Sequence, residues 1–272
     1  MRIRKKKWID DELESSQIYI KKEDLKKVLE EKIKKYSFRK IEMEIGCGKG
    51  GFISNLALLH DDILYIVIET SFTMLGMANR NIRKKYEEMG KEANNIILIN
   101  LNAENLKKEI GECFEFLKIS RIYLNFSNPW PKAKHKKRRL THPRQLLQYL
   151  EILDENAEIF IRTDDQDFFE DSLIYVLNVH KFSYRYKKSF DEYVNNNKEY
   201  LLDNVKKQLN KLENNDLLED IILPELYIYK ITNDLKKDNI FENFVENIET
   251  EHEKEFSKKG KNIYAAIINR RK

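Results

Sequence analysis

Hydrophobic residues between positions 40 and 187 follow two different spacings. Short runs rich in Ile, Val, Leu and Tyr predict buried strands at 40–45, 63–69, 95–100, 121–125, 157–162 and 182–187. Apolar residues at helical spacing predict helices at 52–59, 74–89 and 143–153. Strands and helices that alternate in this way indicate βαβ units. We therefore expect an α/β fold with a mostly parallel sheet and helices on both faces.

Three further segments complete the expected domain, which spans residues 1–272. Residues 1–37 hold a basic arm followed by apolar positions at helical spacing, which predicts an N-terminal arm and helix. Residues 263–268 predict a last strand, which would bring the sheet to seven strands. Residues 190–248 are rich in Asn, Lys and Glu but keep Leu201 and Val205 at helical spacing, so we expect a helical insertion there.

Composition limits the class of protein. Hydrophobic residues make up 41% of the 272 residues, which is typical of a globular protein. The net charge is only +4 although 35% of residues are charged, so the position of the cations matters more than their excess. Two cysteines suit a reducing compartment, and no run reaches the roughly 20 apolar residues of a membrane span. We expect a cytoplasmic protein without membrane contact and, because the histidines lack ligand spacing, without a metal.

A glycine-rich turn follows the first expected strand. Gly46 and Gly48 would let backbone N–H groups approach a ligand at a helix N-terminus, and Glu69 ends the next strand where it could bind ribose hydroxyls. The pattern fits a dinucleotide or S-adenosylmethionine. Glu44, just before the first glycine, would repel a pyrophosphate but tolerate an ammonium and a sulfonium, which favours S-adenosylmethionine. Cys47 inside the turn is interpreted as small packing.

The run 123–132, Tyr-Leu-Asn-Phe-Ser-Asn-Pro-Trp-Pro-Lys, is the most informative segment. Pro129 and Pro131 cannot continue a sheet ladder, so the chain must turn outward in an elbow, which we define as residues 126–131. A basic run, which we define as residues 132–139, follows at once. Clustered Lys and Arg at the rim of a sheet would neutralise phosphates, which favours RNA contact over a merely solvated surface. Phe126 is interpreted as an ordinary core aromatic.

A family becomes recognisable from these segments together. The glycine turn 44–50, the elbow with residues 135–141, Arg-Thr-Asp at 162–164, Thr-Glu-His-Glu at 250–253, and Gly260 with Ile-Tyr at 263–264 occur in matching order. The chain resembles the tRNA (guanine-N7-)-methyltransferase family over about residues 38–187 and 245–270. The resemblance implies a Rossmann-like methyltransferase that moves a methyl group from S-adenosylmethionine to a guanine N7 in the tRNA variable loop.

The resemblance also implies roles for individual residues. The donor site would be lined by Glu44, Gly46, Gly48, Glu69, Asn102, Ala103 and Asn128. The substrate guanine would be contacted by Lys132, Asp164, Thr250 and Glu253. The RNA would meet Lys134, His135, Lys136, Lys137, Arg138 and Arg139. The family pattern has Asp at the catalytic position of Asn128, and usually Asp at that of Asn102.

Other interpretations stay open at this point. Asn128-Pro129-Trp130 resembles motifs of enzymes that methylate exocyclic amines. A non-catalytic RNA-binding relative and a nicotinamide oxidoreductase are further alternatives. Whether the protein is a monomer or a homodimer is left undecided.

Overall fold

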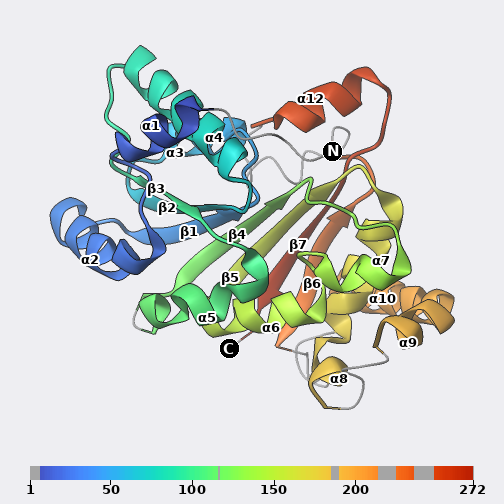
Figure 1. The fold of residues 1–272 in the computed structure, drawn as a ribbon. Helices are drawn as coiled ribbons and strands as arrows, with labels where there is room; N and C mark the ends of the chain where they lie inside the picture. Colours follow the sequence, from blue (N-terminus) through green and yellow to red (C-terminus); the bar gives the residue numbers. More distant parts are fainter. Residues whose placement is uncertain (1–6, 116, 185–189, 214–224, 236–247, 272) are drawn as a thin grey trace.

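One central sheet of seven strands organises the protein. The computed structural model describes residues 7–115, 117–184, 190–213, 225–235 and 248–271, and the strand order is β3-β2-β1-β4-β5-β7-β6 (Figure 1). The strands are β1 (Lys40–Ile45), β2 (Ile63–Glu69), β3 (Ile96–Asn100), β4 (Ile119–Asn125), β5 (Leu153–Thr163), β6 (Leu226–Thr232) and β7 (Tyr264–Arg270). The first five strands are parallel to one another, and β7 runs antiparallel to both β5 and β6.

The central strands are largely buried because helices cover both faces of the sheet. Every residue of β2 is buried, and its side chains alternate between the two cores. Leu64 and Ile66 face one core, whereas Tyr65 and Val67 face the other. The parallel strands end at one edge of the sheet, and the loops that follow β1, β2 and β4 lie at this edge.

Helices pack on the two faces in two groups (Figure 1). One face carries α1 (Trp8–Glu14), α3 (Gly51–Leu59) and α4 (Phe72–Glu88). The other carries α2 (Leu25–Tyr36), α5 (Leu106–Ile110), α6 (Pro143–Ile152), α7 (Gln166–Leu177), α8 (Val179–Tyr184), α9 (Phe190–Asn196) and α10 (Lys198–Glu213). The short helix α12 (Glu251–Lys258) lies over the edge at which the parallel strands end.

The N-terminal arm is folded from Trp8 onward. Ile9 and Leu13 of α1 are buried against α4. Gly76 of α4 makes this close packing possible, because a Cβ atom there would lie 2.7 Å from Cγ2 of Ile9. The expected helix before the first strand is confirmed as α2. The arm's cations at positions 1–6 lie outside the described residues.

The expected strand at 182–187 is wrong. Residues 182–184 end helix α8, and 185–187 lie outside the described residues. Phe182 is buried because its ring packs edge-on against His142 and Phe190. Phe182 therefore serves a contact between helices, although the aromatic spacing at 182–187 resembles a strand pattern.

The remaining strand of the sheet comes from the segment expected to be a helical insertion. Two helices, α9 and α10, are present there as expected. However, β6 also lies within it and pairs antiparallel with β7. The run Leu-Tyr-Ile-Tyr-Lys-Ile-Thr of β6 is typical of a strand, so the sequence contained this signal, but the polar composition of the surrounding segment outweighed it.

Candidate functional site

The glycine turn brings the ends of β1 and β2 together. Gly46, Gly48 and Gly50 adopt φ values of 81°, 56° and 76°, in the left-handed region that favours glycine. At Gly50 a Cβ atom would also lie 3.1 Å from Cβ of Ala78, so α3 and α4 approach closely there. The N–H of Gly48 donates to Oε2 of Glu69 at 3.1 Å. The turn is therefore held by the carboxylate that we expect to bind ribose.

Glu44 lies beneath this turn with an incomplete set of partners. Its side chain is buried, and Oε1 accepts a hydrogen bond from Nδ2 of Asn125 at 2.9 Å. Among the described groups, Oε2 has no hydrogen-bond partner. Burial raises the pKa of Glu44 to about 7; Asn125 and Arg162 oppose this rise, and Glu69 adds to it. A ligand with an ammonium group would supply the missing donor and charge, so the site fits S-adenosylmethionine.

A buried polar chain runs from Glu44 to α12. Oδ1 of Asn125 accepts from Nε of Arg162 at 2.8 Å, and Nη1 of Arg162 donates to Glu253 Oε2 and to the carbonyl of Ile248, each at 3.0 Å. Arg162 has no exposed surface and lies over the ring of Phe52. Sequence reasoning did not assign Asn125 or Arg162 a role. The available signal was a polar residue directly after a short apolar run, 122–124 in β4 and 159–161 in β5.

Thr250 and Glu253 both lie in this chain, at the start of α12. Oγ1 of Thr250 accepts from the N–H of Glu253 at 2.9 Å, and Oε2 of Glu253 accepts from the N–H of Thr250 at 3.3 Å. This reciprocal pair is a capping box, which fixes the first turn of the helix. Their direct contact with a guanine stays a prediction. In the structure, Glu253 anchors α12 to Arg162, and Thr250 caps the helix beside it.

The elbow leaves the sheet directly beside this chain. The N–H of Phe126 donates to the carbonyl of Arg162 at 2.8 Å, and Oδ1 of Asn128 accepts from the N–H of Trp130 at 3.0 Å. An Asp at position 128 could accept the same bond, so Asn preserves the turn. The interpretation of Phe126 as a core aromatic is wrong. It is half-buried with φ 48°, and its ring meets His252 and Phe256 of α12.

The basic run is divided between solvent and interior. Lys132, Lys134, Lys137 and Arg138 are exposed, and the guanidinium of Arg138 lies 5.2 Å from the centre of the Trp130 ring. The half-buried His135 packs on the same ring, 5.8 Å between centroids. Arg138 and His135 therefore border one aromatic ring, and the exposed cations of this run face solvent.

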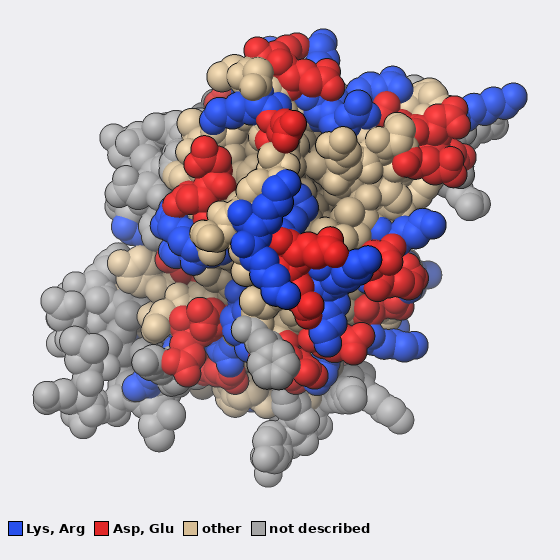
Figure 2. Space-filling view, turned by 90° about the vertical axis from the view of Figure 1, so that its left-hand side faces the viewer, with Lys and Arg blue, Asp and Glu red and all other residues tan. Residues whose placement is uncertain are grey.

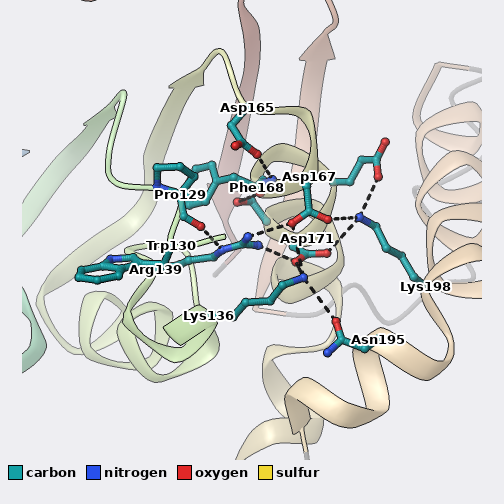
Figure 3. Close-up of polar contacts among 12 residues, drawn as sticks. Pro129, Trp130, Lys136, Arg139, Asp165, Asp167, Phe168, Asp171, Asn195 and Lys198 are labelled. Atoms are coloured by element: carbon teal, nitrogen blue, oxygen red, sulfur yellow. Dashed lines mark hydrogen bonds and ion pairs between the residues drawn. The ribbon is translucent and has the colours of Figure 1, made fainter. Parts of the chain in front are cut away.

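The expected RNA contact of Lys136 and Arg139 is corrected by their burial. Lys136 is 7% exposed and Arg139 not at all, and both bind the buried carboxylate of Asp171 on α7 (Figure 3). Residues 133–138 form a 3₁₀ turn, in which positions three apart share a face. Positions 136 and 139 therefore point inward together. Their spacing of three residues is visible in the sequence, so it could have indicated a shared face.

The other expected site residues lie around the same edge. Asp164, at the end of β5, is half-buried and pairs with Lys261 at 2.7 Å. Asn102 is exposed and caps the next turn through the N–H of Glu104 at 3.0 Å, and Ala103 beside it is buried. In the described parts of the chain, no cluster of three or more His, Cys, Asp or Glu residues could hold a metal ion.

Charges elsewhere on the surface are mixed. On the face at the left of Figure 1, acidic and basic side chains are interspersed across the described part (Figure 2). That described part carries no broad surface of one sign, so the cations at the elbow are the more specific feature. None of the helices described is both long and apolar enough to span a membrane.

The fold and the glycine turn define a Rossmann-like methyltransferase. Residues 38–218 match a family model described as "Putative methyltransferase". The crystal structure of the 16S rRNA methyltransferase KamB is similar, with a TM-score of 0.52, 9% identity, and coverage of 90% of this chain and 93% of that one. At this identity the likeness supports the fold alone.

Relatives at much higher identity specify the family. The tRNA (guanine-N(7)-)-methyltransferase of Clostridium botulinum strain Eklund 17B is 48% identical, and the match covers 64% of this chain and 78% of that protein. The protein of the same name from Clostridium beijerinckii is 44% identical with the same coverage. The chain belongs to the tRNA (guanine-N7-)-methyltransferase family, which confirms the resemblance seen in the sequence.

Proposed function

We propose that this protein transfers the methyl group of S-adenosylmethionine to N7 of a guanine in the variable loop of tRNA. Family membership supports the reaction. The structural observation that carries the proposal is the bond between Asn125 and Glu44, because it joins the strand that leads into the elbow to the carboxylate beneath the glycine turn. A donor on the turn and a base at the elbow would thus lie at one edge of the sheet.

Several residues of this edge would hold the donor. Glu44 would face its ammonium, and Glu69, already bonded to the backbone of Gly48 and Ser71, keeps lone pairs for ribose hydroxyls. Gly46 and Gly48 leave room for the backbone to approach, while Asn102 and Ala103 would border the adenine. When bound, the donor supplies an electrophilic methyl group on a positively charged sulfur.

Transfer to N7 makes modest demands on the protein. The N7 lone pair is free, so no proton must leave first, and the residues act mainly by orienting the base towards the methyl group. Positive charge develops on the imidazole part of the purine, and a nearby carboxylate would stabilise it. Asn128 supplies no negative charge, whereas Asp164 would supply one. Lys132 would be a second contact to the substrate. Direct contact of Glu253 with the base would compete with Arg162.

The tRNA would lie along the exposed part of the basic run. Lys134, Lys137 and Arg138 would meet phosphates, and His135 with Trp130 offers a ring surface beside them. Lys136 and Arg139 would hold the run in place from below. This division of roles follows from burial, because a phosphate cannot reach a fully buried guanidinium.

The test is methylation of bulk tRNA with isotopically labelled S-adenosylmethionine, followed by strand cleavage at N7-methylguanine. We expect label in tRNA and cleavage in the variable loop. The Glu69→Ala variant should lose donor binding, and Lys207→Met, an exposed change on α10, should keep it. Label on an exocyclic amine would favour the alternative target, and absence of label with intact RNA binding would favour the non-catalytic relative.

A further inference from the structure

An ion cluster joins the elbow to α10. It holds three cations, Lys136, Arg139 and Lys198, and three carboxylates, Asp167, Glu170 and Asp171 (Figure 3). The carboxylates lie on α7, two cations belong to the basic run, and Lys198 begins α10. Lys136, Arg139 and Asp171 are buried, whereas the side chain of Asp167 is 51% exposed. The opposite charges make burial of the inner three tolerable.

Arg139 connects the cluster to the elbow itself. Its Nε donates to the carbonyl of Pro129 at 2.6 Å, Nη1 to Asp171 at 2.5 Å and Nη2 to Asp167 at 2.9 Å. The planar guanidinium holds these donors in fixed directions, so the position of the two carboxylates sets that of Pro129. Pro129 lies between Asn128 and Trp130, the centre of the elbow.

Lys198 holds the same two carboxylates from the opposite side. Its Nζ lies 2.8 Å from Oδ1 of Asp167, 3.0 Å from Glu170 and 3.4 Å from Oδ1 of Asp171. Oδ1 of Asp171 is buried and accepts no hydrogen bond from the described groups. The ammonium of Lys198 faces this oxygen, whereas Lys136 and Arg139 bind Oδ2 of the same carboxylate. Without Lys198, three carboxylates would face two cations, and Arg139 would be drawn away from Pro129.

The ionisation of the cluster agrees with this geometry. Partial burial opposes ionisation of Asp167, yet hydrogen bonds from Lys198 and Arg139 hold its pKa well below the ordinary value. Partial burial likewise disfavours charge on Lys198, but its bonds to Asp167 and Glu170 raise its pKa. Asp167 and Lys198 therefore stay charged across the neutral range, and their ion pair acts as a fixed brace.

We propose that Lys198 is a positioning residue for the elbow, and that α10 braces the elbow and the exposed cations beside it through this lysine. The path runs from Lys198 through Asp167 and Asp171 to Arg139 and the Pro129 carbonyl. The expected effect of Lys198 on tRNA binding rests on the proposed function. Its expected effect on the order of the elbow does not.

Elbow order can be measured without activity. The chain has two tryptophans, so Trp8→Phe leaves Trp130 as the sole indole reporter at the elbow. In that background, Lys198→Met should shift the emission of Trp130 and reduce amide exchange protection of residues 126–140 about fivefold to thirtyfold. Lys198→Arg should restore both. Lys207→Met, the same change at an exposed pair on α10, should alter neither.

Two further readouts separate the possible failures. Exchange protection of β1 and β4 should stay unchanged in Lys198→Met, which distinguishes a loosened elbow from global unfolding. In tRNA methylation the variant should raise KM for tRNA severalfold with KM for S-adenosylmethionine unchanged. Unchanged Trp130 emission and elbow protection would overturn the inference. If the wild type does not methylate tRNA, the proposed function is rejected. A loosened elbow in Lys198→Met would still uphold the positioning role of Lys198 in that case.

Discussion

Arg162 and Glu253 lie 91 positions apart in the chain, and their side chains meet at 3.0 Å in the interior. The same guanidinium reaches Asn125, which binds Glu44. One buried cation thus lies between two buried carboxylates, and it connects the glycine turn with the helix α12.

Arg162→Met should be strongly destabilising, because it leaves Glu44 and Glu253 buried without a cation. We expect a loss of about 3–5 kcal/mol in the free energy of unfolding, measured by urea denaturation. The control is Lys261→Met, which breaks a pair whose lysine is half exposed, and it should lower the free energy of unfolding far less than Arg162→Met does. Equal losses in the two variants would contradict a structural role for the buried chain.

Donor binding should depend on pH through Glu44. Its folded pKa of about 7 lies above the ordinary 4.5, so the folded protein keeps a proton that the unfolded chain has lost between these values. Stability therefore falls as pH rises through this window. The carboxylate that forms near pH 7 can pair with the donor's ammonium, and affinity should rise by up to about tenfold per pH unit between 6 and 7.

Calorimetry at several pH values with wild type and Glu44→Gln checks this expectation. The variant should bind the donor weakly and with a flatter pH profile, since only ionisation of the donor and of other groups remains. It should also be spared the loss of stability that the wild type undergoes between about pH 5 and 7. An identical pH profile in both proteins would reject Glu44 as the titrating group.

Exposed and buried cations of the basic run should behave differently when removed. Lys137→Ala or Arg138→Ala should weaken tRNA binding and lower the slope of log affinity against log salt by about 1 for each phosphate that is no longer neutralised. Lys136→Met should instead lower the melting temperature, because Lys136 binds the buried Asp171 at 2.6 Å. Filter binding over a range of salt, with thermal melts, distinguishes the two; an unchanged melting temperature for Lys136→Met would refute its structural role.

Asn128→Asp should keep the elbow and increase the methylation rate. The Asp carboxylate can still accept the bond from the N–H of Trp130, and it adds negative charge where the base becomes cationic. We expect a severalfold rise in kcat with little change in melting temperature. Single-turnover methylation of tRNA is the measurement, and an unchanged rate would show that no charge is missing at this position.

The strands at the donor edge were predictable because their signals are local. A continuous apolar run gave β2, and alternating apolar residues gave β1. The glycines with Glu44 and Glu69 marked the turn between strand and helix. By contrast, β6 is an edge strand within a polar segment, whose composition outweighed its strand pattern. The aromatic run at 182–187 resembled a strand, but Phe182 packs between helices. Residue spacing does not reveal which partner an aromatic will meet.

The sequence by itself determined the alternation of strands and helices, the glycine turn, and a basic run that follows a proline-rich elbow. Only the tertiary structure decided what the charges do. Arg139 and Arg162 are buried because carboxylates on α7 and α12 compensate them, while Arg138 is left to solvent beside Trp130. A charge can leave water only where distant segments bring an opposite charge to it, and that meeting depends on the fold.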